Sequence, residues 1–441
     1  MVSQSLSNCL GAVWLVAACW GVVPAVLVID QILAIARGWW PAARVELCLT
    51  AANVVLLAVI IGVATGAMVR QTTWNWIARR AGKLCLLGVA VWSALALTDV
   101  LLHRFGQSLW NQPTNVRPPN LRIVFHPRGD IMPGVSGDAC YCTNSDGLRG
   151  SEIPPPGAGQ RIICLGGSTT ECTYLDDAET WPALVAEALN SSDSSKEMHV
   201  WVGAAAVSGA GTREHLRFVE TSPLMSEIDL LVVLCGVNDL VAALGGGPSP
   251  HAVAPWLWSK LALPKLILVT WSRWTAAARL ETEDPQGRNY VARRAARAVA
   301  PVCETSPSLD TVLAAYGRRL QRIADACRKH HVRLILVEQP VLWSESLPDD
   351  FTRLLWLGQL PDGRYLTVSG LREAMDAFNA VTREVAVENA ATSVDTSSLM
   401  GRPELFYDDC HLNERGAREL AALVAKAMAP IAPANAVPVD D

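Results

Sequence analysis

The sequence lacks the motifs that bind metal ions, phosphate groups or nucleic acids. Its 12 cysteines include no pair of CxxC motifs, the arrangement typical of zinc sites, and no glycine-rich phosphate loop is present. The formal net charge is −5, so the chain as a whole attracts a polyanion such as DNA only weakly. We therefore expect no metal, no other cofactor and no nucleic acid partner.

The N-terminus also lacks the basic residues with which a cleaved signal peptide begins. It reads MVSQSLSN, and three long apolar segments follow it, at residues 9–29, 47–69 and 84–102. A helix needs ~20 residues to cross the hydrocarbon core of a membrane, which is about 30 Å thick, and each segment is long enough. We expect residues 1–104 to form a membrane anchor of three transmembrane helices.

Basic residues in the two loops between these segments predict the orientation of the anchor, because such residues are enriched on the cytoplasmic side of a membrane. The second loop has more of them than the first: Arg70, Arg79, Arg80 and Lys83 against Arg37 and Arg44. This bias predicts a cytoplasmic N-terminus at the inner membrane. After three crossings, the rest of the chain is then extracytoplasmic (periplasmic). The opposite orientation, with a cytoplasmic domain, stays open.

Beyond the anchor, residues 105–139 are rich in proline and asparagine and are predicted to be a linker, and residues 140–441 are predicted to form one domain. In that domain short β-branched runs alternate with helical patterns. Strands are expected at 161–165, 198–202, 229–235, 332–338 and 393–396, and helices at 181–190, 212–220, 309–330, 370–389 and 413–428. Since apolar residues are consecutive in the strands, both faces of the sheet must be covered. This predicts an α/β fold with a flavodoxin-like, doubly wound parallel sheet.

An insertion interrupts the domain at about residues 243–308, between the third and fourth predicted strands. It carries four tryptophans, Trp256, Trp258, Trp271 and Trp274. Its apolar stretch is too short, and too interrupted by Pro264 and Lys265, for a fourth crossing. Three interpretations stay open: a lid, an interfacial helix on lipid headgroups, and a helical excursion packed on the domain.

Small and polar residues follow the predicted strands, at the edge where a doubly wound sheet binds ligands. Ser168 lies in GGSTT after the first strand, Gly209 in VSG after the second and Asn238 in GVND after the third. Asp408 and His411 lie in DDCH before the last helix. Each alone has a structural explanation, such as a helix cap. Together they supply what acyl transfer from an ester requires.

In this order the motifs resemble the blocks of the SGNH/GDSL hydrolase superfamily. The flanking segments TNSDGLRG (143–150), ETWPALVAEALN (179–190) and FYDDCHLNERGARELA (406–421) resemble a membrane-anchored bacterial subgroup of it. The resemblance covers about residues 140–428 and implies a serine esterase. It departs from the family at two places: the first block is GGST rather than GDSL, and the second lacks its usual Asn-Ala-Gly lead-in. The second departure leaves the oxyanion geometry open.

The resemblance and the chemistry of esters assign a role to each residue. Ser168 is the nucleophile, and a base must remove its proton because a hydroxyl is weakly nucleophilic at neutral pH. His411 is that base, and Asp408 orients its imidazole, with Asp409 as the alternative orienting acid. The oxyanion hole is predicted to consist of the Ser168 amide, the Gly209 amide and the Asn238 side chain.

Eight cysteines lie beyond the predicted spans, where an oxidising compartment would permit disulfides. Cys140 and Cys142 are too close in sequence for an ordinary one. Cys172 lies four residues after the predicted nucleophile, and Cys410 adjoins the predicted base. If the motifs converge, these two sulfurs come within bridging distance. Two hypotheses stay open for this pair: a disulfide between Cys172 and Cys410, and two buried free thiols.

We interpret the chain as a membrane-anchored serine esterase that hydrolyses O-acyl groups, with O-acetyl groups as one candidate, through an acyl-enzyme. The expected substrate is an acylated glycan or lipid. One alternative is an O-acyltransferase that passes the acyl group to an extracytoplasmic glycan, with a membrane acyltransferase as partner. The other is a non-enzymatic, glycan-binding accessory subunit of a membrane complex.

Overall fold

The computed structural model describes residues 115–191, 199–245 and 286–428, together with scattered positions between residues 80 and 105. The chain divides into two compact units: Met1–Asn111 with Pro250–Ser272, and Gln112–Ser249 with Arg273–Asp441. The second unit contains the α/β domain. The tryptophans of the predicted insertion lie outside the described residues.

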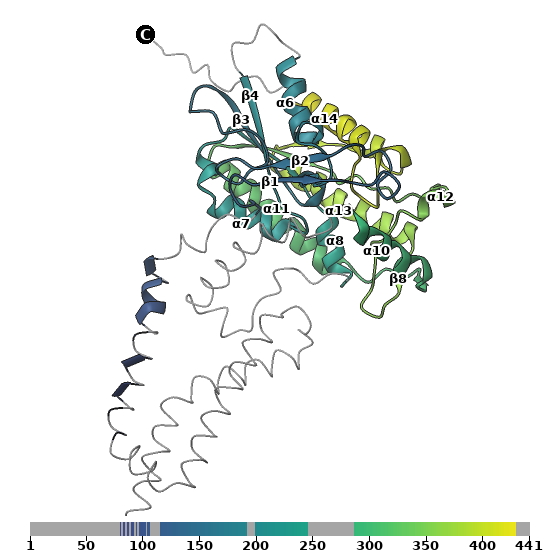
Figure 1. Ribbon diagram of the computed structural model, residues 1–441, viewed down its shortest axis with the longest axis horizontal. Coiled ribbons are helices and arrows are strands. Elements are labelled where there is room, and N and C mark those ends of the chain that lie inside the picture. The colour runs from purple at the N-terminus through teal and green to yellow at the C-terminus, as the bar shows by residue number, and fades with distance from the viewer. Residues whose placement is uncertain are drawn as a thin grey trace, which may run out of the picture. The chain divides into compact units, whose positions relative to one another are not determined.

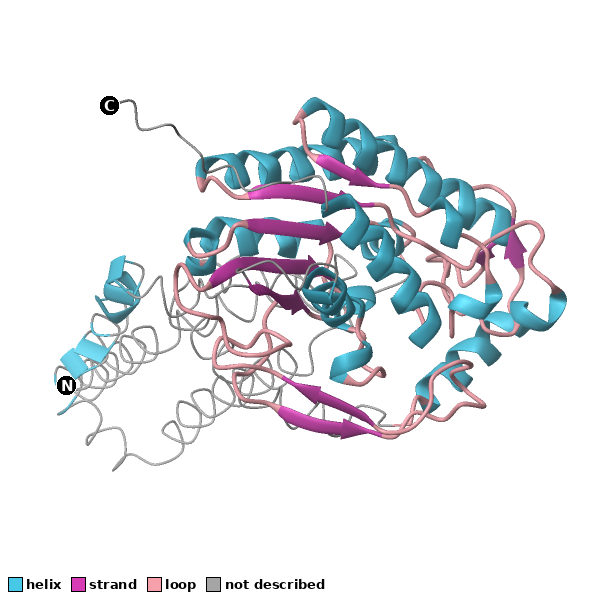
Figure 2. Cartoon of the chain, turned by 90° about the horizontal axis from the view of Figure 1, so that it is seen from above, coloured by secondary structure: helices cyan, strands magenta, loops and turns pink. Residues whose placement is uncertain are grey.

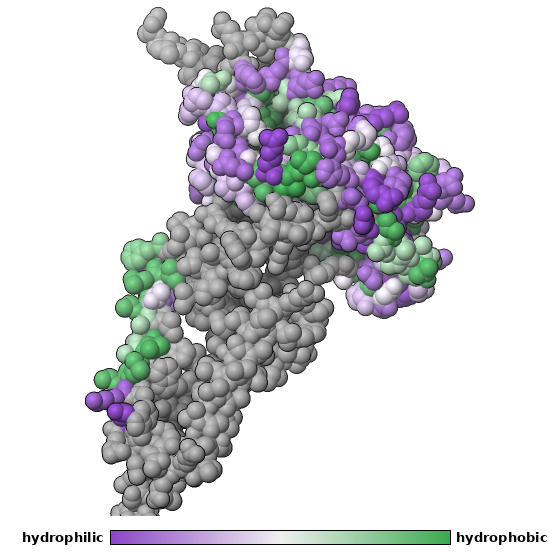
Figure 3. Space-filling view, viewed as in Figure 1, coloured by the Kyte–Doolittle hydropathy of each residue, from purple (hydrophilic) through white to green (hydrophobic). Residues whose placement is uncertain are grey.

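The first two predicted transmembrane helices also lie outside the described residues, and the third lies partly within them. Where the structure is described, no helix has both the length and the apolar character needed to cross a membrane. The described positions of the first unit nevertheless expose large apolar side chains: Leu86, Leu87, Leu97, Val100, Leu101 and Phe105. Figure 3 shows the resulting hydrophobic surface along this part of the chain.

A parallel sheet of five strands forms the centre of the second unit (Figure 1). Its strands are β3 (Gly159–Gly166), β4 (His199–Ala206), β5 (Leu230–Leu234), β7 (Arg333–Val337) and β9 (Thr392–Val394). They lie in the order β4-β3-β5-β7-β9, and Figure 2 shows their arrows pointing the same way. Numbered along the chain this is the flavodoxin-like order 2-1-3-4-5. The predicted parallel α/β fold is confirmed.

The central strands are buried because their residues are apolar on both faces. All five residues of β5, with the sequence LLVVL, are buried. In the middle of the sheet Val232 pairs with Cys164 of β3 on one side and with Ile335 of β7 on the other. Side chains alternate between the faces of a strand, so such a run needs helices on both sides.

Helices cover the two faces of the sheet as expected (Figure 1). On one face α6 (Trp181–Ser191) packs against α14 (Glu414–Met428). On the other, α11 (Asp310–Lys329) packs against α7 (Thr212–Thr221) and α13 (Val368–Glu388). All five helices begin and end close to their predicted bounds. The structure also describes these helical elements: α5 (Ser168–Glu171), η1 (Asp177–Glu179), η2 (Pro223–Ser226), α8 (Val237–Ala243), α10 (Arg288–Val299), α12 (Asp349–Thr352), η4 (Ser397–Leu399) and η5 (Pro403–Leu405).

Part of the predicted linker is in fact a β-hairpin. Strands β1 (Arg122–Phe125) and β2 (Ala139–Cys142) pair antiparallel, so the linker prediction for 105–139 is wrong over β1. Ile123 and Phe125 are buried while Val124 between them is exposed, which is the alternation of a strand with one covered face. Strand β1 has only four residues and lies between prolines, so its alternation of buried and exposed residues is too short to predict a strand from the sequence. A second small sheet pairs β6 (Val302–Cys303) with β8 (Tyr365–Leu366).

Candidate active site

Ser168 begins the short helix α5 at the carboxyl end of the central strand β3. The two glycines before it allow a close approach of neighbouring groups. A Cβ on Gly166 would lie 2.1 Å from Thr170 Oγ1, and a Cβ on Gly167 would lie 2.3 Å from Asn238 Nδ2. Only glycine therefore fits at either position, and the tight turn presents Ser168 at the edge where such sheets bind ligands.

The structure brings Ser168, His411 and Asp408 together. His411 lies between the other two: its Nε2 is 2.8 Å from Ser168 Oγ, and its Nδ1 is 2.7 Å from Asp408 Oδ2. When Nδ1 donates to the carboxylate, Nε2 is left to accept the serine hydroxyl proton. This is the geometry of a nucleophile, a base and an orienting acid. The catalytic roles themselves stay a prediction.

The carboxylate of Asp408 is fully buried and accepts four hydrogen bonds. Oδ1 accepts the backbone N–H groups of Cys410 and His411, at 3.0 and 2.8 Å. Oδ2 accepts from His411 and from the Nε1–H of Trp356, the latter at 3.0 Å. Burial opposes the charge, but His411 and these donors hold the pKa of Asp408 below its ordinary value. The acid thus stays ionised beside the imidazole.

Asp409, the alternative orienting acid, has a different set of partners. Its Oδ1 accepts from Trp343 Nε1 at 2.8 Å, and its Oδ2 accepts from the backbone N–H groups of Trp356 and Leu357, at 2.6 and 3.2 Å. Burial and the neighbouring charge of Asp408 raise the pKa of Asp409 to about 6. Asp409 therefore fastens the segment that carries Trp356, and the geometry favours Asp408 as the acid that orients the imidazole.

Two tyrosine rings enclose the imidazole of His411. Tyr407 stacks on it, with ring centroids 5.5 Å apart and an interplanar angle of 7°. Tyr290 of α10 meets it edge-on, at 6.4 Å and 90°. Both tyrosines are buried, so they restrict the rotation of the imidazole and keep water from those sides. The end of the predicted insertion thus contributes a wall of the site.

The predicted oxyanion donors lie on turns that end three adjacent strands. Asn238, in α8 after β5, donates its Nδ2–H to Ala210 O at 2.9 Å and lies against Gly167. Gly209, in the turn after β4, is exposed and has a φ of 82°, which favours glycine. Since β4, β3 and β5 are neighbours, these turns meet at the edge that carries Ser168. Their action on an oxyanion stays a prediction.

Glu171 links the nucleophile helix to the turn that carries Gly209. Its side chain is fully buried, and its Oε2 accepts from the backbone N–H and the hydroxyl of Ser208, at 2.6 and 2.5 Å. Its Oε1 accepts from Arg117 Nε at 2.6 Å and from Tyr141 OH at 3.1 Å. The charge of Arg117 compensates that of Glu171. Neither Glu171 nor Trp356 lies in a motif that the sequence predicts to be functional. The available signal for Glu171 was its place three residues after Ser168 in a helix.

Cys172 and Cys410 are free, buried thiols, so of the two hypotheses for this pair the disulfide is wrong. Cys172 ends α5 in a left-handed conformation with φ 50°, and its Sγ lies 3.5 Å from Thr169 O. Cys410 Sγ lies 3.7 Å from His411 Nδ1. Each sulfur thus contacts its own turn. Burial raises the pKa of the Cys172 thiol to about 11, which keeps it protonated at neutral pH.

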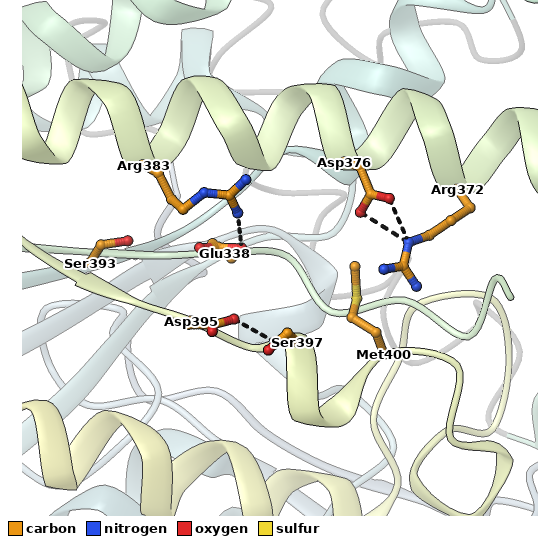
Figure 4. Close-up of a pocket in the computed structure, with 8 residues that line it drawn as sticks. All are labelled: Glu338, Arg372, Asp376, Arg383, Ser393, Asp395, Ser397 and Met400. Carbon is orange, nitrogen blue, oxygen red and sulfur yellow. Dashed lines mark hydrogen bonds and ion pairs between the residues drawn. The ribbon is translucent and has the colours of Figure 1, made fainter.

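A pocket of about 400 Å³ lies beyond the carboxyl ends of β7 and β9, apart from the triad. Figure 4 shows it: Arg383 reaches Glu338 on one side, and Arg372 reaches Asp376 on the other. It is lined by Glu338, Arg372, Asp376, Arg383, Ser393, Asp395, Ser397 and Met400. Neither Ser168 nor His411 lines this pocket, so it is separate from the candidate active site.

Two groups of donor atoms, among the residues that the structure describes, lie close enough to hold a metal ion. One consists of Asp408, Cys410 and His411 and overlaps the candidate triad. The other consists of Cys140, Cys142 and Asp177. Neither group was predicted from the sequence, because neither contains the paired CxxC motifs that are typical of zinc sites.

Comparison with solved structures gives matches of low similarity. The crystal structures of TesA, of Axe2, an acetylxylan esterase from Geobacillus stearothermophilus, and of the acetyl xylan esterase AlAXEase match with TM-scores of 0.34, 0.36 and 0.35. In the same order, their sequence identities to this chain are 14, 15 and 13%. The matches cover 62, 62 and 60% of this chain and 100, 95 and 98% of the solved chains. These values are too low to carry an inference about function. No curated protein matches the chain.

A family model is more informative, because it matches more than half of the chain. The model of the GDSL-like lipase/acylhydrolase family matches residues 164–419. The match begins in β3, just before Ser168, and ends in α14, beyond His411. The chain belongs to the GDSL-like lipase/acylhydrolase family and is an enzyme that hydrolyses esters.

Proposed function

We propose that this enzyme is a membrane-anchored serine esterase that removes O-acyl groups, acetyl among them, from an extracytoplasmic glycan or lipid. The observation that carries the catalytic part is the continuous hydrogen-bonded chain from Ser168 through His411 to Asp408, with distances of 2.8 and 2.7 Å. The parts on location and substrate class rest on the apolar N-terminal segments and on the chemistry of the site.

In the first half-reaction Ser168 Oγ attacks the ester carbonyl carbon while its proton moves to His411 Nε2. Asp408 stabilises the imidazolium that forms, and the amides of Ser168 and Gly209 with Asn238 Nδ2 hold the negative oxygen. The carbon–oxygen bond to the alcohol then breaks, and the alcohol leaves with the proton from His411. The acyl group stays on Ser168.

In the second half-reaction water attacks the acyl-enzyme, gives its proton to His411 and releases the carboxylic acid, which restores Ser168. A sugar hydroxyl in place of water would give the O-acyltransferase, with the same residues in the same roles. The two functions therefore share one acyl-enzyme and differ only in the second acceptor. We favour hydrolysis because the family to which the chain belongs is one of ester hydrolases.

The membrane anchor is supported by three segments long enough to cross a bilayer and by exposed apolar side chains on the described part of the third. Leu86 and Val100, for example, are 71 and 62% exposed. Side chains of this kind are stable in lipid and unfavourable in water. Fractionation of cells checks this part: the chain should stay with membranes after a carbonate wash, and its recovery in the soluble fraction would contradict the anchor.

A hydrolysis assay on the full-length chain in detergent tests the catalytic part. With a chromogenic acetate ester, we expect turnover that Ser168→Ala abolishes and that Ser226→Ala, an exposed serine in η2, leaves unchanged. A fluorophosphonate should label the wild-type chain and not Ser168→Ala. Acyl transfer to a glycan without hydrolysis would support the transferase. Failure of the folded chain to react with the fluorophosphonate would support the accessory subunit.

A further inference from the structure

Two cysteines outside the candidate active site lie side by side on strand β2. Cys140 and Cys142 are two positions apart in the strand, so their side chains point to the same face. Their sulfurs are 3.3 Å apart, and both residues are half-buried. Asp177, the first residue of η1, supplies a carboxylate oxygen, and the three donor atoms all lie within 4.8 Å of one another.

Backbone and side-chain hydrogen bonds hold these donors in place. The N–H of Cys140 donates to Asp176 Oδ2 at 3.1 Å, and the N–H of Cys142 donates to Asp177 Oδ1 at 3.2 Å. Arg149, which is almost fully buried, donates its Nε–H to the same Oδ1 at 2.7 Å. Strand β2 and η1 are thus joined through the group that carries the third donor, and Asp177 keeps its second oxygen for a ligand.

We propose that Cys140, Cys142 and Asp177 bind a thiophilic divalent cation of the zinc class. Zinc takes two thiolates and a carboxylate in tetrahedral geometry, with Zn–S of about 2.3 Å, which places two sulfurs roughly 3.8 Å apart. The observed 3.3 Å needs a separation only about half an ångström wider. A water completes the four ligands. Soft sulfur ligands select zinc or cadmium over magnesium or calcium.

Charge and protons balance in this step. The step starts from the two free thiols that the structure contains at Cys140 and Cys142. Binding forms two metal–sulfur bonds and one metal–oxygen bond, and it releases the two thiol protons to water. The cation's two charges replace those protons, so the net charge of the site is unchanged and Arg149 keeps its ion pair with Asp177.

The site is separate from the triad but lies one side chain away from the nucleophile helix. Arg149 also donates to the carbonyl oxygens of Glu171, Cys172 and Leu175, in the turn that follows Ser168. A cation held by Asp177 therefore ties the β1–β2 hairpin to this turn. Two of the three ligands precede the segment that the family model matches, and none of the three belongs to the candidate triad, so the inference does not depend on the esterase function.

Cadmium binding to the reduced full-length chain tests the proposal, because a cadmium–thiolate bond has a charge-transfer absorbance in the ultraviolet. We expect such a band in the wild-type chain. Cys140→Ser and Cys142→Ser should each remove the part of its absorbance that comes from one tightly bound cadmium ion. Cys303→Ser, a buried cysteine outside the group, should leave it unchanged. Asp177→Asn keeps an oxygen for Arg149 and should weaken cadmium affinity by at least ~10-fold. Loss of a residue that only hydrogen-bonds to a metal ligand already lowers metal affinity by about that factor.

A measurement on the wild-type chain covers the case in which a variant fails to fold. Zinc should protect Cys140 and Cys142 from iodoacetamide, as read by peptide mass spectrometry. Equal alkylation with and without zinc would overturn the proposal, as would a cadmium band that survives both serine substitutions. Protein isolated without reductant gives a further check. If it contains a disulfide between Cys140 and Cys142 that zinc with a mild reductant does not replace, the proposal is also overturned.

Discussion

Trp356 offers a sharp test of the triad, because its indole shares the catalytic carboxylate with the imidazole. Its Nε1–H and His411 Nδ1–H both donate to Oδ2 of Asp408, at 3.0 and 2.7 Å. In Trp356→Phe the ring is kept but this donor is lost. The carboxylate then concentrates its charge on His411, which favours the imidazolium. We expect the acidic limb of kcat/KM to move to higher pH.

The size of the shift follows from the strength of the lost bond. A hydrogen bond to a charged group stabilises by about 1.5–3 kcal/mol, and one pKa unit is about 1.36 kcal/mol. If half of the lost stabilisation is transferred to the imidazolium, the acidic limb moves by about half a unit to one unit. The unfolding free energy should fall by roughly the full value, because Asp408 stays buried with one donor fewer.

Trp343 provides a matched control. Its Nε1–H donates to Asp409 Oδ1 at 2.8 Å, so Trp343→Phe removes the same kind of bond from the neighbouring acid, which holds no imidazole. Hydrolysis of the chromogenic ester from pH 5 to 9, with urea unfolding in parallel, separates the two effects. Both variants should lose stability, but only Trp356→Phe should move the acidic limb. An unmoved limb in Trp356→Phe, or an equal shift in Trp343→Phe, would refute the reasoning.

Three further outcomes are expected. Asn238→Ala should lower kcat by ~10²–10³ with little change in KM, because the amide acts on charge that develops in the transition state; a change confined to KM would assign Asn238 to substrate binding. Gly167→Ala should abolish turnover and destabilise the fold, since the new Cβ would meet Asn238 Nδ2 at 2.3 Å and Ala210 O at 2.8 Å; full activity would show that the turn is looser than described. Burial lowers the pKa of His215 despite the charge of Asp239, so the unfolded chain takes up a proton below pH ~6.5 that the folded chain excludes. Stability should therefore fall as the pH drops through that value, and His215→Leu should flatten this slope in urea titrations compared with wild type.

The sequence by itself determined the five strands of the central sheet, the five helices that cover it and the order of the site motifs. The run LLVVL predicted a buried strand because apolar residues on successive positions need cover on both faces. Ser168, Asn238 and His411 could be found because each lies in a motif of short sequence range, directly after a strand or before a helix. The anchor prediction likewise rests on local length and hydropathy, and it stays a prediction for the residues outside those described.

Tertiary structure decided what depends on contacts between distant segments. The partners of Asp408 and Asp409 differ only because Trp356, more than fifty residues earlier, brings its indole to one carboxylate and its backbone to the other. Glu171 became a link between two turns because the parallel sheet places the end of β4 beside that of β3. The choice between a disulfide and two free thiols at Cys172 and Cys410 also depended on tertiary structure: nearness of two motifs does not set the direction of two sulfurs, which the local backbone fixes.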